Sequence, residues 1–322
     1  MEKNSQLLGI SNAIVDVLSH VDEDFLKEVG APPGSMTLIE EDKARSLGKK
    51  MQSKTETSGG SVANTIAGFA NLGGKASYIG RVNDDYLGNV FYKDMKSIGV
   101  DVRLKPQPAR ERTASCHVLI DKTGQRTMQT HLGACTELAA KDLTNKTIGN
   151  PNVILLEGFL WDIPESNLIV SNVIEIASIK NTKIALSLSD SFCVDRHRNS
   201  FLKIIKESAS IVFGNEDEFI SLLEIDNFEN ALDKLNNYSA IFVITKGSSG
   251  SIIKNDSNII YQNAIEVGSI KDTTGAGDAY TAGFLYQWTL NRSLQECAEA
   301  GTICSSEVIQ KIGGRIDSNL KI

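Results

Sequence analysis

The chain has 322 residues, 41% of them hydrophobic and 23% charged, an ordinary composition that excludes an extended disordered protein. A formal net charge of −7 provides no basic surface for nucleic acid. No apolar run approaches the ~18 residues of a membrane helix, and the N-terminal segment lacks the basic region of a signal peptide. The five cysteines include no C-x-x-C pair. They therefore indicate a reducing compartment, and we predict a cytoplasmic protein.

The first third of the chain predicts a small β layer. Two extended runs, 113–121 and 125–131, flank a Lys-Thr-Gly turn and are typical of a hairpin. Residues 16–40 have the character of strands and loops around two prolines and a glycine. We expect the segments 16–40 and 108–131 to form a small β-sheet lid over the main body.

A glycine-rich turn lies between these segments. Gly59-Gly60-Ser61 precede a predicted helix at 65–72, and Gly73-Gly74 follow it. Ser61 and Asn64 carry hydroxyl and amide groups suited to sugar hydroxyls, although a tight turn with a serine cap explains the same pattern. A P-loop is excluded, because Ala76 stands where a Ser or Thr must bind magnesium.

The remaining two-thirds alternate short apolar runs with longer segments of helical spacing. The runs are 153–156, 184–188, 211–213 and 241–244, and the helical segments include 167–179 and 201–209. This alternation is typical of βαβ units, so we predict one α/β domain over 1–322, a doubly wound, mostly parallel sheet flanked by helices. Ligands of such sheets bind at the carboxyl ends of the strands.

The most informative segment is Asp-Thr-Thr-Gly-Ala-Gly-Asp at 272–278, which opens onto a predicted buried helix. Backbone amides at a helix start point outward and bind anions. Gly275 and Gly277 would let a phosphate approach the backbone closely. Asp278 either caps the helix or takes a proton from an attacking hydroxyl. A carboxylate beside a phosphate repels it, so its presence favours the chemical role.

Together, Gly59-Gly60-Ser61 with Asn64 and the 272–278 segment resemble the two signatures of the ribokinase-like, or PfkB, carbohydrate kinases. The resemblance covers essentially the whole chain. Two further segments agree with it. Asn215-Glu216-Asp217-Glu218 resembles the family's Asn-x-x-Glu magnesium and phosphate motif, and residues 245–250 resemble its nucleotide-contacting loop.

The resemblance implies an ATP-dependent, Mg²⁺-dependent kinase. Asp278 would be the catalytic base, and the amides of Gly275, Ala276 and Gly277 would hold the transferring phosphoryl group. The resemblance also implies that the acceptor is bound by Asn12, Asp16, Gly60, Ser61 and Asn64. The nucleotide would contact Asn215, Thr245, Gly247, Gly250 and Gly277. Asn215 and Glu218 would bind magnesium through water, and Asp272 would help hold a monovalent cation such as K⁺.

Within this family, the segments 125–128, 157–162 and 189–193 resemble the adenosine kinases. Phe159 and Trp161 follow a predicted strand and could stack on a purine, although core packing explains them equally well. We therefore predict phosphorylation of the primary 5′ hydroxyl of adenosine. The alternative is a sugar kinase of the same family that acts on ribose, fructose or a keto-deoxy sugar acid.

Other functional classes receive less support. A non-catalytic nucleotide or sugar sensor would not need to keep Asp278, and a dehydrogenase would need a Gly-x-Gly-x-x-Gly fingerprint, which is absent. We expect a small-molecule substrate, no nucleic-acid or membrane partner, and a monomer or homodimer. The sequence leaves the roles of Arg112, Arg126 and His131 open.

Overall fold

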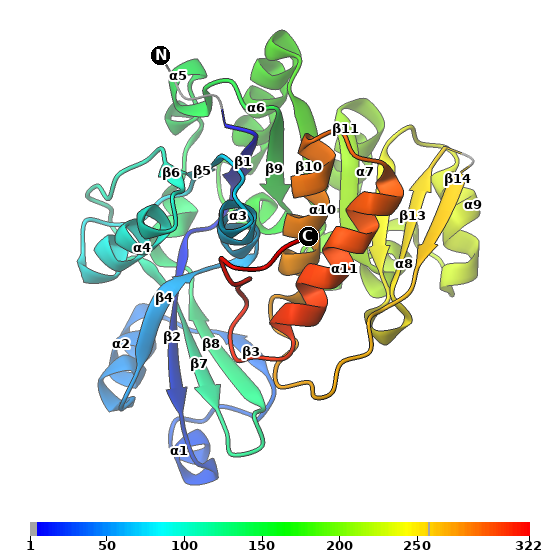
Figure 1. Ribbon diagram of the computed structural model, residues 1–322. Coiled ribbons are helices and arrows are strands. Elements are labelled where there is room, and N and C mark those ends of the chain that lie inside the picture. The colour runs from blue at the N-terminus through cyan, green and yellow to red at the C-terminus, as the bar shows by residue number, and fades with distance from the viewer. Residues whose placement is uncertain (1–4, 257) are drawn as a thin grey trace.

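The computed structural model describes residues 5–256 and 258–322. Its strands form a nine-stranded sheet and a separate five-stranded sheet, with helices packed around both (Figure 1). The predicted α/β class, a doubly wound and mostly parallel sheet with a small second sheet, is confirmed.

The large sheet has β10 at its centre, and β1 is the third strand from one edge. The seven strands from β6 at one edge through β5, β1, β9, β10 and β11 to β12 all run parallel. Strand β13 pairs antiparallel with β12, and β14 pairs antiparallel with β13. In spatial order the strands are β14 (Asn258–Gln262), β13 (Ser251–Asn255), β12 (Ile241–Thr245), β11 (Ala209–Asn215), β10 (Lys183–Ser187), β9 (Val153–Glu157), β1 (Leu7–Ile10), β5 (Ala76–Ile79) and β6 (Asp101–Val102).

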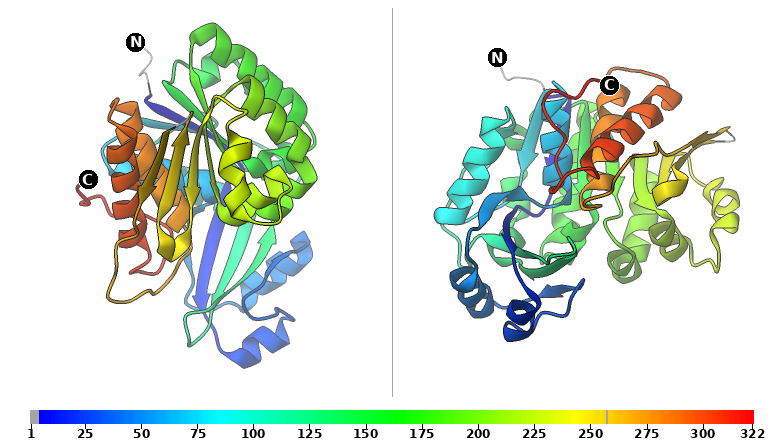
Figure 2. Two further views of the ribbon diagram at one scale, coloured as in Figure 1. Left: turned by 90° about the vertical axis from the view of Figure 1, so that its right-hand side faces the viewer. Right: turned by 60° about the horizontal axis from the view of Figure 1, so that its bottom comes forward.

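Helices cover both faces of the large sheet (Figure 2, left). One face packs against α3 (Ser61–Asn71), α4 (Tyr86–Ser97), α10 (Ala276–Thr289) and α11 (Leu294–Val308). The other face packs against α5 (Asn145–Ile148), α6 (Ser166–Lys180), α7 (Ser191–Glu207), α8 (Glu216–Leu223) and α9 (Ala231–Leu235).

Burial on both faces explains the unbroken apolar strands that the sequence contains. All five residues of β9 are buried, and successive side chains enter opposite cores. Leu155 belongs to the core beneath α10, whereas Ile154 and Leu156 belong to the core beneath α6 and α7. Continuous apolar strands are expected only where a parallel sheet is covered on both sides.

The second sheet leaves the carboxyl edge of the large one, because β1 ends at Ile10 and β2 begins at Ile14. Its spatial order is β3 (Met36–Leu38), β8 (Arg126–His131), β7 (Ala114–Ile120), β2 (Ile14–His20) and β4 (Thr55–Gly59). Helices α1 (Glu23–Glu28) and α2 (Glu41–Lys50) cover one of its faces, as Figure 1 shows below the large sheet.

Some local predictions are confirmed and others are wrong. The hairpin is confirmed as β7 and β8, which pair antiparallel. Residues 16–40 contain the helix α1 as well as strands, and 55–59 form an additional strand, β4, that the pattern did not indicate. Helix α3 begins at residue 61 rather than 65, and its cap is Gly60 at φ +95° rather than a serine.

None of the helices within residues 5–256 and 258–322 combines the length and the apolar character that crossing a bilayer requires.

Candidate active site

A small cavity of about 110 Å³ lies where β11 and β12 end and α10 begins. Four separate sequence motifs meet in it, because it is lined by Ser61, Asn215, Glu218, Thr245, Gly277 and Asp278. The carboxyl ends of the strands are where an α/β sheet places its ligands. The site residues therefore converge although they are far apart in the sequence.

The 272–278 segment forms a tight turn into α10. Gly275 caps the helix at φ +75°, and a Cβ there would lie 2.4 Å from Cα of Gly314. Gly277 faces open space, since a Cβ there would meet nothing within 4 Å. The glycines therefore differ in function: Gly275 is needed for the backbone conformation, and Gly277 leaves room for a ligand.

The amides of this turn are only partly free. The N–H of Ala276 donates to the carbonyl of Thr273 at 3.2 Å. Within the described residues, the N–H groups of Gly277 and Asp278 have no backbone or side-chain acceptor. Unpaired amides at a helix start bind anions, so this structure offers the amides of 277 and 278 rather than that of 276.

Asp278 is held by the first turn of α3. Ser61 Oγ donates to Asp278 Oδ1 at 2.6 Å, and Asn64 Nδ2 lies 3.5 Å from Oδ2. Burial raises the pKa of Asp278 to about 6, and the negative charge of Asp16 raises it further, while the two hydrogen bonds oppose the change. The carboxylate is thus oriented and remains ionised at neutral pH.

Asn215 and Glu218 form a reciprocal capping box at the start of α8. Asn215 Oδ1 accepts from the N–H of Glu218 at 2.9 Å, and the Glu218 carboxylate accepts from the backbone N–H and Nδ2 of Asn215 at 3.1 and 2.8 Å. Burial raises the pKa of Glu218 to about 7, and the charges of Asp190, Asp217 and Asp278 contribute. An oxygen ligand with excess negative charge around it fits a magnesium ion bound through water.

The nucleotide-loop residues divide into two groups. Thr245 lines the cavity, and Gly247, at φ +54°, is surrounded by open space within 4 Å. Gly250 lies at φ +85°, and a Cβ there would come within 2.0 Å of the carbonyl oxygen of Gln262. Gly250 is therefore required by the packing of the β13–β14 hairpin, and of the three residues only Thr245 lines the described cavity.

Asp16, the residue expected to bind the acceptor, lies on β2. Its carboxylate lies against Gly59, where a Cβ would be 2.2 Å from Oδ2. Burial raises the pKa of Asp16 to about 6, while the positive charges of Arg315 and Arg126 lower it. Gly60 allows a similarly close approach, since a Cβ there would lie 2.8 Å from the carbonyl oxygen of Asn12.

Glu157 is a buried acidic residue near the site to which the sequence analysis gave no role. It is 1% exposed, and its carboxylate accepts from the backbone N–H of Asn12 at 2.9 Å and of Val62 at 3.4 Å. Burial raises its pKa to about 7, and Asp278 adds to the shift. Glu157 thus fixes the loop after β1 relative to α3. The available signal was one acidic residue ending a buried apolar run.

The C-terminal segment also reaches the site. Arg315 Nη1 donates to Asp94 at 2.9 Å, and its Nη2 donates to the carbonyl and hydroxyl oxygens of Ser58. Ser58 also donates its N–H and Oγ–H to Asp94, each at 2.8 Å. This network holds the glycine turn at 59–60 from behind, and it was not predicted.

Asp272, the expected position of a monovalent cation, is paired with an arginine in this structure. The buried carboxylate pairs with Arg126 of β8 and accepts the N–H groups of Thr274 and Gly313, each at 3.0 Å. A guanidinium therefore supplies positive charge beside this carboxylate, and the monovalent cation stays a prediction. The ion pair also joins the second sheet to the 272–278 turn.

The aromatic predictions need correction at Trp161. This side chain is 5% exposed, belongs to the core and packs edge-on against Phe201 with a ring-centroid distance of 4.9 Å. Phe159 is only partly buried, and its carbonyl accepts from Nδ2 of Asn12 at 3.4 Å. Of the two rings, Phe159 is the less buried, and its contact with a purine stays a prediction.

Comparisons with known proteins agree with this geometry. Residues 34–321 match the model of the pfkB family carbohydrate kinases. Two solved structures are each 38% identical with a TM-score of 0.89: an adenosine kinase from Sinorhizobium meliloti, covering 97% of this chain and 96% of that one, and a probable sugar kinase from Rhizobium etli, covering 97% and 95%. Adenosine kinase 2 of Arabidopsis thaliana is 27% identical over 95% of this chain and 94% of its own length.

A family match over nearly the whole chain, and two close structures that cover it, leave one assignment. The chain belongs to the pfkB family of carbohydrate kinases and is a kinase.

Proposed function

We propose that this kinase transfers the terminal phosphoryl group of ATP to the 5′ hydroxyl of adenosine, with Asp278 as general base. The observation that carries the proposal is the position of Asp278. Its carboxylate is oriented by Ser61 and lines the same cavity as Gly277, Glu218 and Thr245. A base, an anion-binding turn and an acidic magnesium position are the parts that phosphoryl transfer requires.

The proposed chemistry is a direct displacement. Asp278 takes the proton of the acceptor hydroxyl as that oxygen bonds to the terminal phosphorus, and the bond from this phosphorus to the bridging oxygen of ADP breaks. A pKa of about 6 leaves the base ionised at neutral pH yet basic enough to hold the proton. The amides of Gly277 and Asp278 would hold the phosphoryl oxygens.

The residues present fit a magnesium ion, with Glu218 holding it through water. Asn215 would act indirectly, because its side chain is used to cap α8 and to orient that carboxylate. When bound, Mg²⁺ neutralises charge on the phosphate oxygens. Its charge would also relieve the repulsion between Glu218 and Asp278.

The surroundings of Asp16 favour a nucleoside over a free sugar. Side chains alternate along a strand, so Ile14 and Leu18 share a face of β2 with Asp16. They pack with Met128 and with a small apolar cluster of Cys116, Val118 and Ile120. A hydroxyl-binding carboxylate surrounded by apolar side chains suits a ligand with a sugar and a flat, weakly polar base. A free sugar would need polar partners on every side.

We also propose that the second sheet acts as a lid that excludes water during transfer. Asp16 lies on this sheet while Asp278 lies on the main body, and the Arg126–Asp272 pair joins the two. Closing the sheet would therefore assemble the site and seal it in one movement.

The test is an ATP-consumption assay with adenosine, guanosine, inosine, ribose, fructose and 2-keto-3-deoxygluconate. We expect kcat/KM to be highest for adenosine, by at least about 100-fold over each sugar, because the apolar wall contributes only to binding of a base. A free sugar as the best acceptor would overturn the acceptor assignment and leave the kinase assignment intact.

A further inference from the structure

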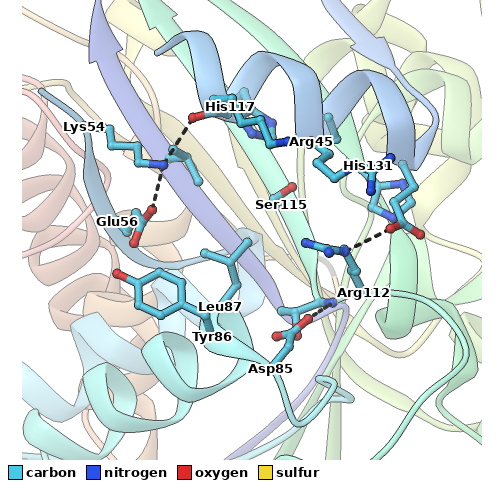
Figure 3. Close-up of a pocket in the computed structure, with 16 residues that line it drawn as sticks. Arg45, Lys54, Glu56, Asp85, Tyr86, Leu87, Arg112, Ser115, His117 and His131 are labelled. Carbon is cyan, nitrogen blue, oxygen red and sulfur yellow. Dashed lines mark hydrogen bonds and ion pairs between the residues drawn. The ribbon is translucent and has the colours of Figure 1, made fainter. Parts of the chain in front are cut away.

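A second and larger cavity, of about 430 Å³, lies on the opposite face of the second sheet from Asp16. It is enclosed by α2, by strands β2, β4, β7 and β8, and by the start of α4 (Figure 3). Ser115 and His117 alternate with Cys116 along β7, so their side chains face this cavity and not the apolar wall beside Asp16. The cavity is therefore separate from the proposed phosphoryl-transfer site.

Its floor carries buried polar atoms without partners. His117 and His131 are 4% and 8% exposed, and both line the cavity. Nε2 of His131 has no hydrogen-bond partner among the described residues. The ring of His117 lies next to the backbone of Gln129, but no described atom completes a hydrogen bond of good geometry with its Nδ1. Burying a polar group without a partner is unfavourable, so two such groups lining one cavity indicate a ligand.

The acidic groups of the wall, in contrast, are already engaged. Glu41 pairs with Arg112 at 2.9 Å, and Glu56 pairs with Lys54 at 3.5 Å. Asp85 accepts from the N–H and hydroxyl of Thr113 at 2.9 and 2.7 Å. These pairs engage basic side chains as well, but the lining keeps a small excess of positive charge, with Arg45, Lys49, Lys54 and Arg112 against Glu41, Glu56 and Asp85.

The basic side chains stand around the two histidines. Figure 3 shows Arg45, Arg112 and Lys54 around the space that Ser115 and the histidines face. Burial lowers the pKa of His117 to about 4, so this ring is neutral at pH 7 and can donate one N–H. Neutral donors at the floor and guanidinium groups at the mouth match oxygen atoms that carry negative charge.

We propose that this cavity is a binding site for a small organic anion bearing carboxylate or phosphate oxygens. Arg112 would pair with the charge, while Ser115, His117 and His131 would donate to the buried end. The cavity is lined both by the second sheet and by Asp85 and Tyr86 at the start of α4. An occupant would therefore hold the sheet in a fixed position relative to the main body.

A divalent cation is the competing occupant. One ligand atom each from Glu41, Glu111 and His131 lie within 4.8 Å of one another. The guanidinium of Arg112 already pairs with Glu41, however, and Arg45 is close by on α2. Positive charge at this position repels a second cation, so the electrostatics favour the anion.

The test is calorimetric titration of the full chain with pyrophosphate, citrate and ZnCl₂ in separate experiments. We compare wild type with Arg112→Gln and Ser115→Ala, and use Arg110→Gln as the matched control. Arg110 is two residues away, 88% exposed at its side chain, and is not among the residues that line the cavity. Thermal melts verify that each variant is folded.

We expect pyrophosphate, citrate or both to bind wild type and Arg110→Gln equally, and Arg112→Gln at least about tenfold more weakly. Preference between the two probes identifies phosphate or carboxylate as the ligand chemistry. No binding of either anion at ~10 mM, or zinc binding that needs Glu41 and His131, would overturn the proposal. So would anion binding that Gly277→Ala abolishes and Arg112→Gln leaves unchanged. The readout does not depend on kinase activity.

Discussion

The two cavities of this protein carry opposite electrostatic signatures. Beside α10, burial raises the pKa of Asp278 to about 6 and of Glu218 to about 7. Behind the second sheet, burial lowers the pKa of His117 to about 4, and basic side chains slightly outnumber acidic ones around the space. A buried group whose charged form is unfavourable is stabilised by a ligand of opposite charge, so the sign of the group indicates the sign of the ligand. The first cavity therefore suits a cation-bearing nucleotide, and the second suits an anion.

The two cavities also differ in how the fold builds them. The first collects side chains from strand ends and helix starts, with hydrogen bonds such as Ser61 to Asp278 at 2.6 Å between segments far apart in sequence. The second uses alternate positions in strand interiors, where Ser115 pairs across the sheet with His131 and His117 with Gln129. Loop positions produce recognisable motifs, whereas a strand face produces only a period of two.

Replacing the proposed base, Asp278, should have the largest effect on turnover. Asp278→Asn should lower kcat at least about 100-fold, because the amide cannot take the acceptor proton. The affinity for ATP should remain within a few-fold of wild type, since the amides of the turn are unchanged. Stopped-assay kinetics and nucleotide titration check this. The exposed Asp226→Asn serves as the control, and normal turnover of Asp278→Asn would remove the base from the mechanism.

Asp16→Ala should act on acceptor binding alone. Loss of charge-assisted hydrogen bonds to sugar hydroxyls should raise the acceptor KM by about 10- to 100-fold. The KM for ATP should change little, because Asp16 lies on the second sheet and ATP is assigned to the α10 side. Initial-rate kinetics with both substrates varied would show this. An unchanged acceptor KM would exclude Asp16 from the acceptor site.

Gly277→Ala and Gly275→Ala form a matched pair. A Cβ at 277 meets nothing within 4 Å, so this variant should fold with an unchanged or slightly higher Tm, while its methyl group obstructs the phosphate and lowers kcat/KM for ATP about tenfold or more. At 275 the backbone is at φ +75°, so alanine should lower the Tm directly. Normal ATP kinetics in Gly277→Ala would place the phosphate elsewhere.

Glu157→Gln should change how the free energy of unfolding depends on pH. The pKa of Glu157 is raised from 4.5 to about 7, so the stability that its protonated form provides is present below pH 4.5 and is lost as the pH rises through 7. Glutamine does not titrate. The deficit in unfolding free energy of the variant should therefore be larger at pH 5 than at pH 8, by up to about 3 kcal/mol. Urea melts at both values measure it, and a pH-independent difference would contradict the assigned pKa.

The fold could be predicted to a large extent from periodicity. Apolar runs such as 153–156 and 241–244 fall within β9 and β12, and the helix after 272–278 is α10. Strand β4 was missed because its sequence, Thr-Glu-Thr-Ser-Gly, is polar, and edge strands need little apolar character. The start of α3 was placed four residues late, because glycine and serine are common in loops and only the fold shows that Gly60 is the cap.

The site was predictable where a single segment carries the chemistry. The 272–278 turn and Ser61 were named from local motifs, and they meet at one cavity. Glu157 and Arg315 were not predictable, since each acts through contacts with residues about 95 or more positions away. Trp161 illustrates the opposite error, because an aromatic residue after a strand can equally well complete the core.

The most direct test of the central claim is a crystal structure of the chain with adenosine and a non-hydrolysable ATP analogue. We predict the terminal phosphate on the N–H groups of Gly277 and Asp278, with the 5′ oxygen of adenosine about 2.6–3.2 Å from the Asp278 carboxylate. A terminal phosphate bound away from this turn, or a 5′ oxygen out of reach of Asp278, would contradict the account.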